Sequence, residues 1–173
     1  YPAALDMYLK ILPAYETLND SATLGMTYGN IGVLYGQMKE FDKAELYIKK
    51  SLAISQDRKD KLQQARDLTN LANIFVYTRK YAPADSSLQL ALAICKEIQN
   101  YPALSQTLMM MGNLHMEQFH LGEAMDYLNQ SNDILVQLGD DYTLATNQGR
   151  LSVIILDMLK PEHKAYLDKY FGG

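Results

Sequence analysis

The chain has 173 residues, of which 48% are hydrophobic and 21% are charged. These values fit a folded domain with a sizeable core and exclude an intrinsically disordered chain. Its 16 Lys and Arg against 20 Asp and Glu give a formal charge of −4. We therefore expect no nucleic-acid partner, because phosphate binding needs a basic surface. No apolar run approaches the roughly 20 residues of a membrane-spanning helix, so no membrane insertion is expected.

The cellular compartment is constrained by cysteine usage. The single cysteine, Cys95, cannot form an internal disulfide, and this favours a reducing compartment. We expect a cytoplasmic protein, with a periplasmic sensor domain as the alternative because a cysteine-poor periplasmic protein would have the same composition. The sequence begins at Tyr1 without a methionine, which is consistent with removal of an upstream segment.

Hydrophobic periodicity predicts helices along the whole chain, without a strand pattern. In chain order the helices are expected at about residues 2–17, 21–38, 42–57, 62–78, 82–98, 102–118, 122–138, 142–159 and 162–171, with ends uncertain by about two to four residues. Only a few polar residues separate consecutive helices. Links that short force neighbouring helices to lie antiparallel.

Proline and capping residues mark several helix ends. A proline stands near the expected start of four helices, where its missing N–H costs little, at Pro2, Pro83, Pro102 and Pro161. Pro13 does not fit, and it should kink or end the first helix and leave residues 15–18 as a separate turn. Asp42 with Glu45 is interpreted as an N-cap and its return partner, and the Asn19-Asp20-Ser21 segment offers cap residues for the second helix.

The helices form pairs that repeat every 40 residues. An alanine recurs in the second helix of each pair, at Ala4, Ala44, Ala84 and Ala124. A small residue recurs in the first helix, at Gly32, Ala72, Gly112 and Ser152. We expect the small residue to let the partner helix approach closely, with the alanine in the facing position.

The recurring positions resemble the tetratricopeptide repeat. The first complete unit carries the pattern at Tyr28, Ile31-Gly32, Tyr35, Phe41, Ala44, Ile48 and Leu52. The period is longer than the usual 34 residues, and Tyr28, Leu68 or Leu108 stands where a tryptophan is common. Longer repeats of this kind look like those of cell-polarity adaptors, kinesin light chains and bacterial regulators or sensors.

The resemblance implies an all-α solenoid of antiparallel helix hairpins, with about nine helices, in one domain over residues 1–173. Its parts are a half repeat at 1–18, full repeats at 21–58, 62–98 and 102–138, and a degenerate repeat at 142–171. In such stacks the first helices line a concave groove. The candidate peptide-binding residues are the first-helix side chains not used for packing, namely Asn30, Arg66, Asn70, Asn73, Tyr77, Gln106, Met109, Asn113, Met116 and Arg150.

The hypothesis of a peptide-binding site depends mainly on the asparagines, because each side-chain amide supplies a donor and an acceptor for an extended peptide backbone. The alternative is that they only join neighbouring helices. The methionines would form an adaptable apolar floor. Other chemistry-bearing residues favour structural roles: His115 takes a core aromatic position, and Cys95 has no nearby histidine in sequence. No catalytic constellation, metal site or cofactor motif is recognised, so we expect neither an enzyme nor a cofactor.

The sequence therefore predicts an interaction scaffold, a module of a larger regulatory or adaptor protein, which binds a partner peptide or helix in the groove. The alternative is a structural module that forms homo-oligomers through its ends. This alternative depends on Tyr1, Ala4, Tyr8 and Ile11, which match the inner face of a second helix although no first helix precedes them. At the other end, Tyr166, Leu167, Tyr170 and Phe171 give the final helix an apolar face.

Overall fold

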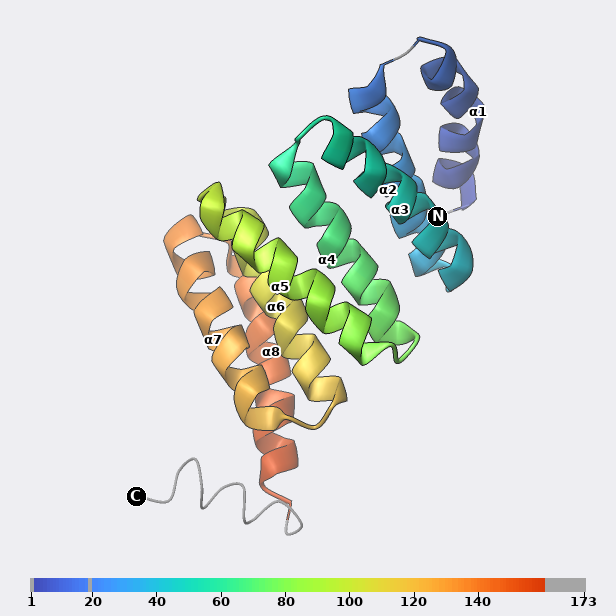
Figure 1. Cartoon of the computed structure of the whole chain (residues 1–173). Coiled ribbons are helices and arrows are strands. Elements are labelled where there is room, and N and C mark those ends of the chain that lie inside the picture. Colours follow the sequence, from blue (N-terminus) through green and yellow to red (C-terminus); the bar gives the residue numbers. More distant parts are fainter. Residues whose placement is uncertain (1, 19, 161–173) are drawn as a thin grey trace. The chain divides into compact units, whose positions relative to one another are not determined.

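The computed structural model describes residues 2–18 and 20–160, which form helices and contain no strand (Figure 1). The expected all-α fold is confirmed. The ninth helix predicted at 162–171, with Tyr166, Leu167, Tyr170 and Phe171, lies outside the described residues, as does Tyr1. The described helices are α1 (Pro2–Leu18), α2 (Ser21–Gln37), α3 (Phe41–Asp57), α4 (Lys61–Tyr77), α5 (Tyr81–Glu97), α6 (Tyr101–Glu117), α7 (Leu121–Leu138) and α8 (Asp141–Met158).

Each link between α2 and α7 turns on one residue with left-handed backbone. At the α2–α3 link, Lys39 has a φ of 62°, and the N–H of Glu40 donates to the carbonyl of Tyr35 at 2.9 Å. This hydrogen bond spans six residues and is characteristic of a Schellman motif, which supplies donors to carbonyl groups at the helix end. The same conformation recurs at Lys59, Arg79, Gln99 and Phe119, and at Gly139 after α7. Five of these six positions are not glycine, so the sequence does not indicate the left-handed backbone there.

The helix N-termini show a second regularity that the sequence reading missed. The first helix of each pair begins after an Asp or Asn whose side chain accepts from the backbone N–H three residues later, at Asp20, Asp60, Asn100 and Asp140. The predicted cap at Asp20 is thus confirmed. The predicted cap at Asp42 is wrong, because α3 already begins at Phe41 and its cap residue, Glu40, makes no side-chain cap bond. Asp42 lies in the first turn, where its charge favours the helix N-terminus.

The prediction that Pro13 ends the first helix and leaves residues 15–18 as a separate turn is also wrong, because α1 continues through this residue to Leu18. Helix α1 is held to α2 on both sides of the proline. Before it, the amide nitrogen of Asn30 donates to the Tyr8 hydroxyl at 3.2 Å. After it, the Tyr28 hydroxyl donates to Glu16 at 2.8 Å. The last turn of α1 is thereby kept helical despite the hydrogen bond that a proline cannot make.

The chain divides into two compact units, Tyr1–Ala103 and Leu104–Gly173, and each is described here by itself. The single-domain interpretation of 1–173 stays a prediction. In the first unit, α1 packs on α2, α2 on α3, α3 on α4 and α4 on α5. In the second, α8 packs on α7 around a core of Leu121, Ala124, Leu128, Ile154 and Met158.

The repeated small residues are where the helices of a pair come closest. A Cβ added at Gly32 would lie 2.5 Å from a side-chain carbon of Ile48 and 3.2 Å from the carbonyl oxygen of Ala44. In the second unit a Cβ at Gly112 would lie 2.8 Å from Leu128. Ala44, Ala84 and Ala124 are fully buried, and so is Ala72. The 40-residue register thus preserves a close helix contact, as expected.

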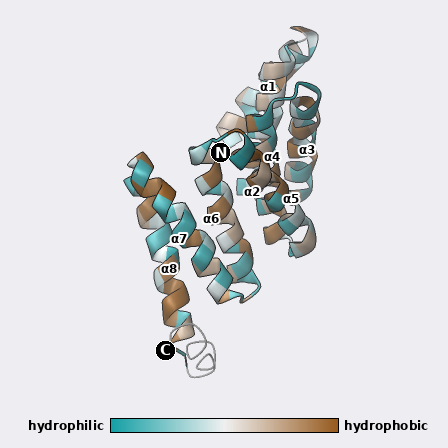
Figure 2. Ribbon diagram, turned by 60° about the vertical axis from the view of Figure 1, so that its left-hand side comes forward, coloured by the Kyte–Doolittle hydropathy of each residue, from teal (hydrophilic) through white to brown (hydrophobic). Residues whose placement is uncertain are grey.

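Aromatic rings line the same interfaces. Tyr35 stacks on Tyr47 with ring centroids 5.5 Å apart, and in the second unit His115 stacks on Tyr127 at 5.2 Å. His115 therefore occupies the aromatic position predicted for it. Figure 2 shows hydrophobic and hydrophilic residues interspersed along the helices.

Candidate functional site

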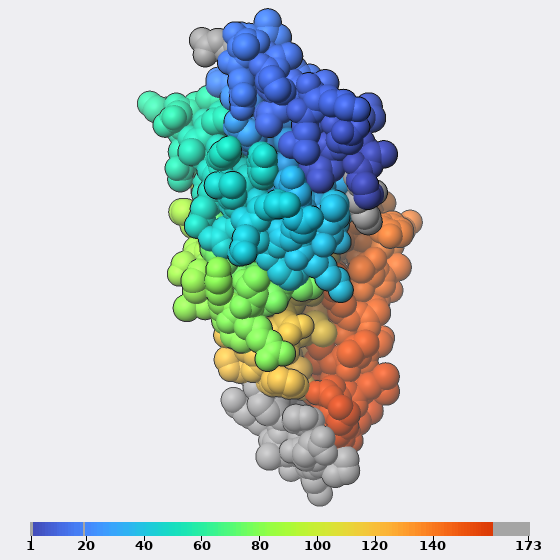
Figure 3. Space-filling model, turned by 90° about the vertical axis from the view of Figure 1, so that its right-hand side faces the viewer, coloured from blue at the N-terminus to red at the C-terminus, as the bar shows by residue number. Residues whose placement is uncertain are grey.

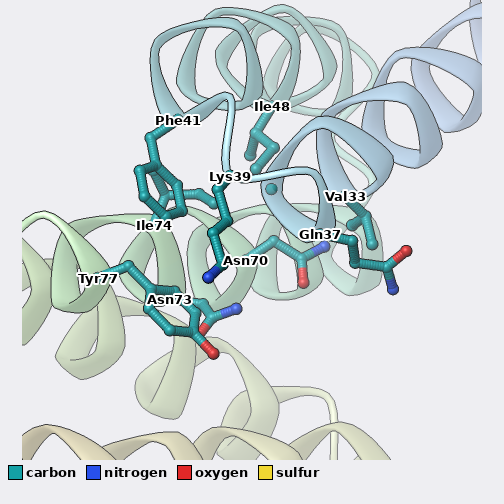
Figure 4. Close-up of a pocket in the computed structure, with 10 residues that line it drawn as sticks. Val33, Gln37, Lys39, Phe41, Ile48, Asn70, Asn73, Ile74 and Tyr77 are labelled. Atoms are coloured by element: carbon teal, nitrogen blue, oxygen red, sulfur yellow. The ribbon is translucent and has the colours of Figure 1, made fainter. Parts of the chain in front are cut away.

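A surface cavity of about 230 Å³ opens in the first unit between α2, the α2–α3 link and α4 (Figure 4). Its apolar floor consists of Val33, Ile48 and Ile74. Gly36 belongs to this floor because a Cβ there would lie 2.9 Å from Ile74. The volume is below the roughly 300 Å³ of pockets that hold small-molecule ligands, so the cavity suits a protein side chain better than a cofactor.

Three of the predicted peptide-binding residues meet at this cavity. Asn70, Asn73 and Tyr77 all project from α4 into it, as Figure 4 shows. Both asparagines are half-buried. Within residues 2–18 and 20–160, no protein group hydrogen-bonds to either side-chain amide. Each amide therefore keeps its donors and its acceptor available to a bound chain.

The rim of the cavity was missed by the sequence reading. Lys39 extends its ammonium group over the opening from the α2–α3 link (Figure 4). Phe41 stacks on Tyr77 with ring centroids 5.7 Å apart and an interplanar angle of 13°. Lys39 is the one charged residue among the described residues that line the cavity. The left-handed backbone at Lys39 aims it there, and no glycine marks that turn in the sequence.

Two further candidates of the first unit lie outside the cavity. Asn30 is used between helices, since its amide donates to the Tyr8 hydroxyl, which is the alternative role considered for the asparagines. Arg66 is exposed on α4 and is not among the lining residues.

The remaining candidates belong to the second unit. Met109 and Met116 are partly buried and pack against its core cluster. Arg150 donates to the side-chain oxygen of Asn147 at 3.3 Å. Gln106 is exposed and Asn113 is half-buried on α6. A role for these five residues in peptide binding stays a prediction.

A buried polar side chain recurs every 40 residues in the first helices, at Thr27, Asp67, Thr107 and Asn147. Asp67 is fully buried. The Ser51 hydroxyl lies 2.9 Å from both of its carboxylate oxygens, the Ser55 hydroxyl lies 3.2 Å from Oδ2, and Gln63 donates to Oδ1 at 2.9 Å. Burial raises the pKa of Asp67 to about 6, although these hydrogen bonds act in the opposite direction.

The network around Asp67 is part of the helix packing. It joins α3 to α4, and Gly29 of α2 closes it, since a Cβ there would lie 3.2 Å from the Ser51 hydroxyl and 3.4 Å from Asp67. In the second unit, Asn147 donates to the Ser131 hydroxyl at 3.1 Å, at positions 80 residues after Asp67 and Ser51. The shared polar register in sequence was the signal that could have revealed this network.

Comparison with known protein families agrees with the repeated helix pairs seen in the structure. Residues 26–97 match the model of a family described as tetratricopeptide repeat, and these residues form the helix pairs α2–α3 and α4–α5. Residues 26–97 are therefore tetratricopeptide repeats. Comparison with curated protein sequences finds no match. Tetratricopeptide repeats form protein-interaction modules, and the matched segment includes the cavity of Figure 4.

Solved structures show the same solenoid fold over nearly the whole chain. The apo form of RapI is 17% identical, with a TM-score of 0.75 over 90% of this chain and 43% of that one. BtubC (BKLC) from P. vanneervenii is 18% identical, with a TM-score of 0.68 over 98% of this chain and 75% of that one. A putative kinesin light chain with nearly identical tetratricopeptide-like repeats from Podosopora anserina is 13% identical, with a TM-score of 0.69 over 96% of this chain and 83% of that one.

These identities establish the fold alone, and the chain spans less than half of RapI. Within the helices that the structure describes, none is long and apolar enough to cross a membrane.

Proposed function

We propose that this tetratricopeptide-repeat chain is a non-catalytic interaction module that binds an extended segment of a partner protein across α2 and α4 of the first unit. The observation that carries the proposal is the meeting of Asn70 and Asn73 at an apolar cavity, with amides that make no hydrogen bond to the described protein.

The lining chemistry supports a peptide as the ligand. The two amides would donate to and accept from a peptide backbone, while Val33 and Ile74 would contact one apolar side chain in the cavity. The stacked Phe41–Tyr77 pair makes a rigid apolar wall beside it. Lys39 is positioned for an acidic residue next to that apolar side chain. With one cation at the rim, binding should depend only modestly on salt.

The test starts from a peptide selected on the parent chain from a random displayed library. Its affinity is then measured by calorimetry for the parent and for the Asn70→Ala, Asn73→Ala double variant. Each lost hydrogen bond should cost about 1 kcal/mol, so the double variant should bind about 30-fold more weakly. Asn129→Ala is the matched control, because Asn129 is an exposed helical asparagine on α7.

Thermal unfolding separates binding from folding. The double variant should melt within a few degrees of the parent, since the two side chains hold no protein group. Equal affinity of the parent and the double variant for every selected peptide would refute the cavity as the binding site.

A further inference from the structure

We infer that Asp67 couples proton binding to ligand binding, so that the cavity of Figure 4 holds a partner segment more tightly when this buried carboxyl group is protonated. This inference rests on the proposed function, because it concerns the regulation of the same cavity. Its basis is that the carboxyl group and the cavity lie along one interface, between α2 and α4 of the first unit.

The α2–α4 interface has two close contacts, one at the carboxyl group and one at the cavity. A Cβ at Gly29 of α2 would lie 3.4 Å from Asp67 of α4, and a Cβ at Gly36 would lie 2.9 Å from Ile74. On each helix the two residues are seven positions apart, which puts them on the same face and about 10 Å from each other. Gly36 and Ile74 line the cavity. Because helices move as rigid elements, a change of spacing at Asp67 reaches the cavity.

The hydrogen bonds around Asp67 favour a protonated carboxyl group. Gln63 donates to Oδ1 at 2.9 Å, and the Ser51 hydroxyl lies 2.9 Å from both carboxyl oxygens. The Ser55 hydroxyl lies 3.2 Å from Oδ2 and 3.0 Å from the carbonyl oxygen of Leu52. Since a hydroxyl has one hydrogen, Ser55 cannot donate to both oxygens. A proton on Oδ2 removes this conflict, because Asp67 then donates to Ser55 while Ser55 donates to Leu52.

The charges around Asp67 also disfavour its ionised form. From α3 and α4 it is faced by the two hydroxyls and the amide of this network, and α2 carries no charged residue along Ser21–Gln37. Arg58, after α3, donates to the Ser21 hydroxyl instead, and Asp60 adds a further negative charge. Among the described residues, no cation offsets the burial, which raises the pKa of Asp67 to about 6.

An ionised Asp67 would need water that the packed interface does not admit. A Cβ at Gly29 would lie 3.2 Å from the Ser51 hydroxyl as well as close to Asp67, so no layer of water separates α2 from the network. On the opposite side the network is held by α3, whose atoms, in cyan and teal, are closely packed in Figure 3. Hydration of the charge therefore requires α2 to move away from α4.

A segment bound in the cavity opposes this movement, because it would contact Val33 of α2 together with Asn70 and Asn73 of α4. A ligand that prefers the closed interface shifts the chain towards that state. By linkage, protonation of Asp67 then raises the affinity for the ligand by the same factor by which the ligand raises the affinity for the proton. Such couplings are typically about 5- to 150-fold. We expect the affinity to fall at least about fivefold as pH rises from about 5 to about 7.5.

Calorimetry tests this with a histidine-free peptide, selected on the parent chain, whose binding is weakened by the Asn70→Ala, Asn73→Ala double substitution. Acidic side chains of the peptide titrate at about pH 4, below the range measured. The parent, Asp67→Asn and Asp57→Asn are compared at about pH 5 and about pH 7.5. Asp57 is an exposed carboxylate of α3, so its substitution removes the same charge outside the network.

The Asp67→Asn amide can donate as the protonated carboxyl group does, so this variant should keep the acidic affinity of the parent at both pH values. Asp57→Asn should lose affinity with rising pH as the parent does. An affinity of the parent that is equal at both pH values, or an Asp67→Asn variant that loses affinity as the parent does, overturns the inference. Either outcome leaves the proposed function standing, because the peptide has already been shown to depend on the two asparagines.

A second measurement needs no peptide. The backbone amide resonances of Gly29 and Gly36 are followed by NMR in the free chain between about pH 4.5 and about pH 8. Both should shift with a common midpoint near the pKa of Asp67, about 6, because both report the same movement of α2. The shifts should vanish in Asp67→Asn and remain in Asp57→Asn. A Gly36 resonance that does not follow that of Gly29 overturns the inference.

Discussion

The buried carboxylate of Asp67 should make the stability of the first unit depend on pH. It is fully buried, and its pKa rises from 3.8 to about 6 because burial disfavours the charge. The groups that face it are the Ser51 and Ser55 hydroxyls of α3 and the Gln63 amide of α4, with Asp60 as a further negative charge. No cation of the described residues faces it to offset the cost.

The sign follows from the raised pKa. Between about pH 4 and pH 6 the folded chain holds a proton on Asp67 that the unfolded chain has lost, so stability falls as pH rises through this window. A shift of about two units corresponds to about 3 kcal/mol. The contribution of protonated Asp67 to stability is fully present below the pKa of this group in the unfolded chain, and it is lost as pH rises through its pKa in the folded chain.

Asp67→Asn should remove this dependence. The chain already contains such an arrangement, in which the Asn147 amide donates to the Ser131 hydroxyl. As pH rises from about 4 to about 7.5, the parent should therefore lose about 2–3 kcal/mol of stability relative to the Asp67→Asn variant. Urea unfolding followed by circular dichroism at several pH values measures this difference. Asp133→Asn, at an exposed position of α7, is the control, and a pH-independent difference for Asp67→Asn would refute the reasoning.

The close helix contacts give two further predictions, both measured by urea unfolding. Ala84→Leu should overpack a fully buried site and destabilise the chain by about 1–3 kcal/mol, and an unchanged free energy of unfolding would contradict the repeat register. Gly32→Ala should destabilise, since the new Cβ would meet Ile48 at 2.5 Å. Gly149→Ala, where nothing lies within 4 Å, should instead stabilise by about 0.5–1 kcal/mol, and the same sign for both glycines would show that the close contact is not the cause.

Much of this fold follows from the sequence, because helix pairs bury their surface against near neighbours in the chain. Spacing alone indicated the helices, their antiparallel pairing and the close approach at Gly32 and Ala44. Periodicity is a local property, so it survives without knowledge of tertiary structure. It also predicted Asn70 and Asn73 on one stripe of α4, which the structure brings to a single cavity.

Tertiary structure decided what local patterns do not encode. Pro13 was expected to kink or end α1, but α1 continues through it, and bonds from Tyr8 and Glu16 to α2 hold the helix on both sides of the proline. Lys39 reaches the cavity because a left-handed residue, not marked by glycine, turns the link. Whether an asparagine binds a ligand or a neighbouring helix depends on what faces it: Asn30 meets Tyr8, whereas Asn70 meets open space. Such contacts join residues far apart in the chain, and their energy comes from packing and hydrogen bonding that exist only once the helices have come together.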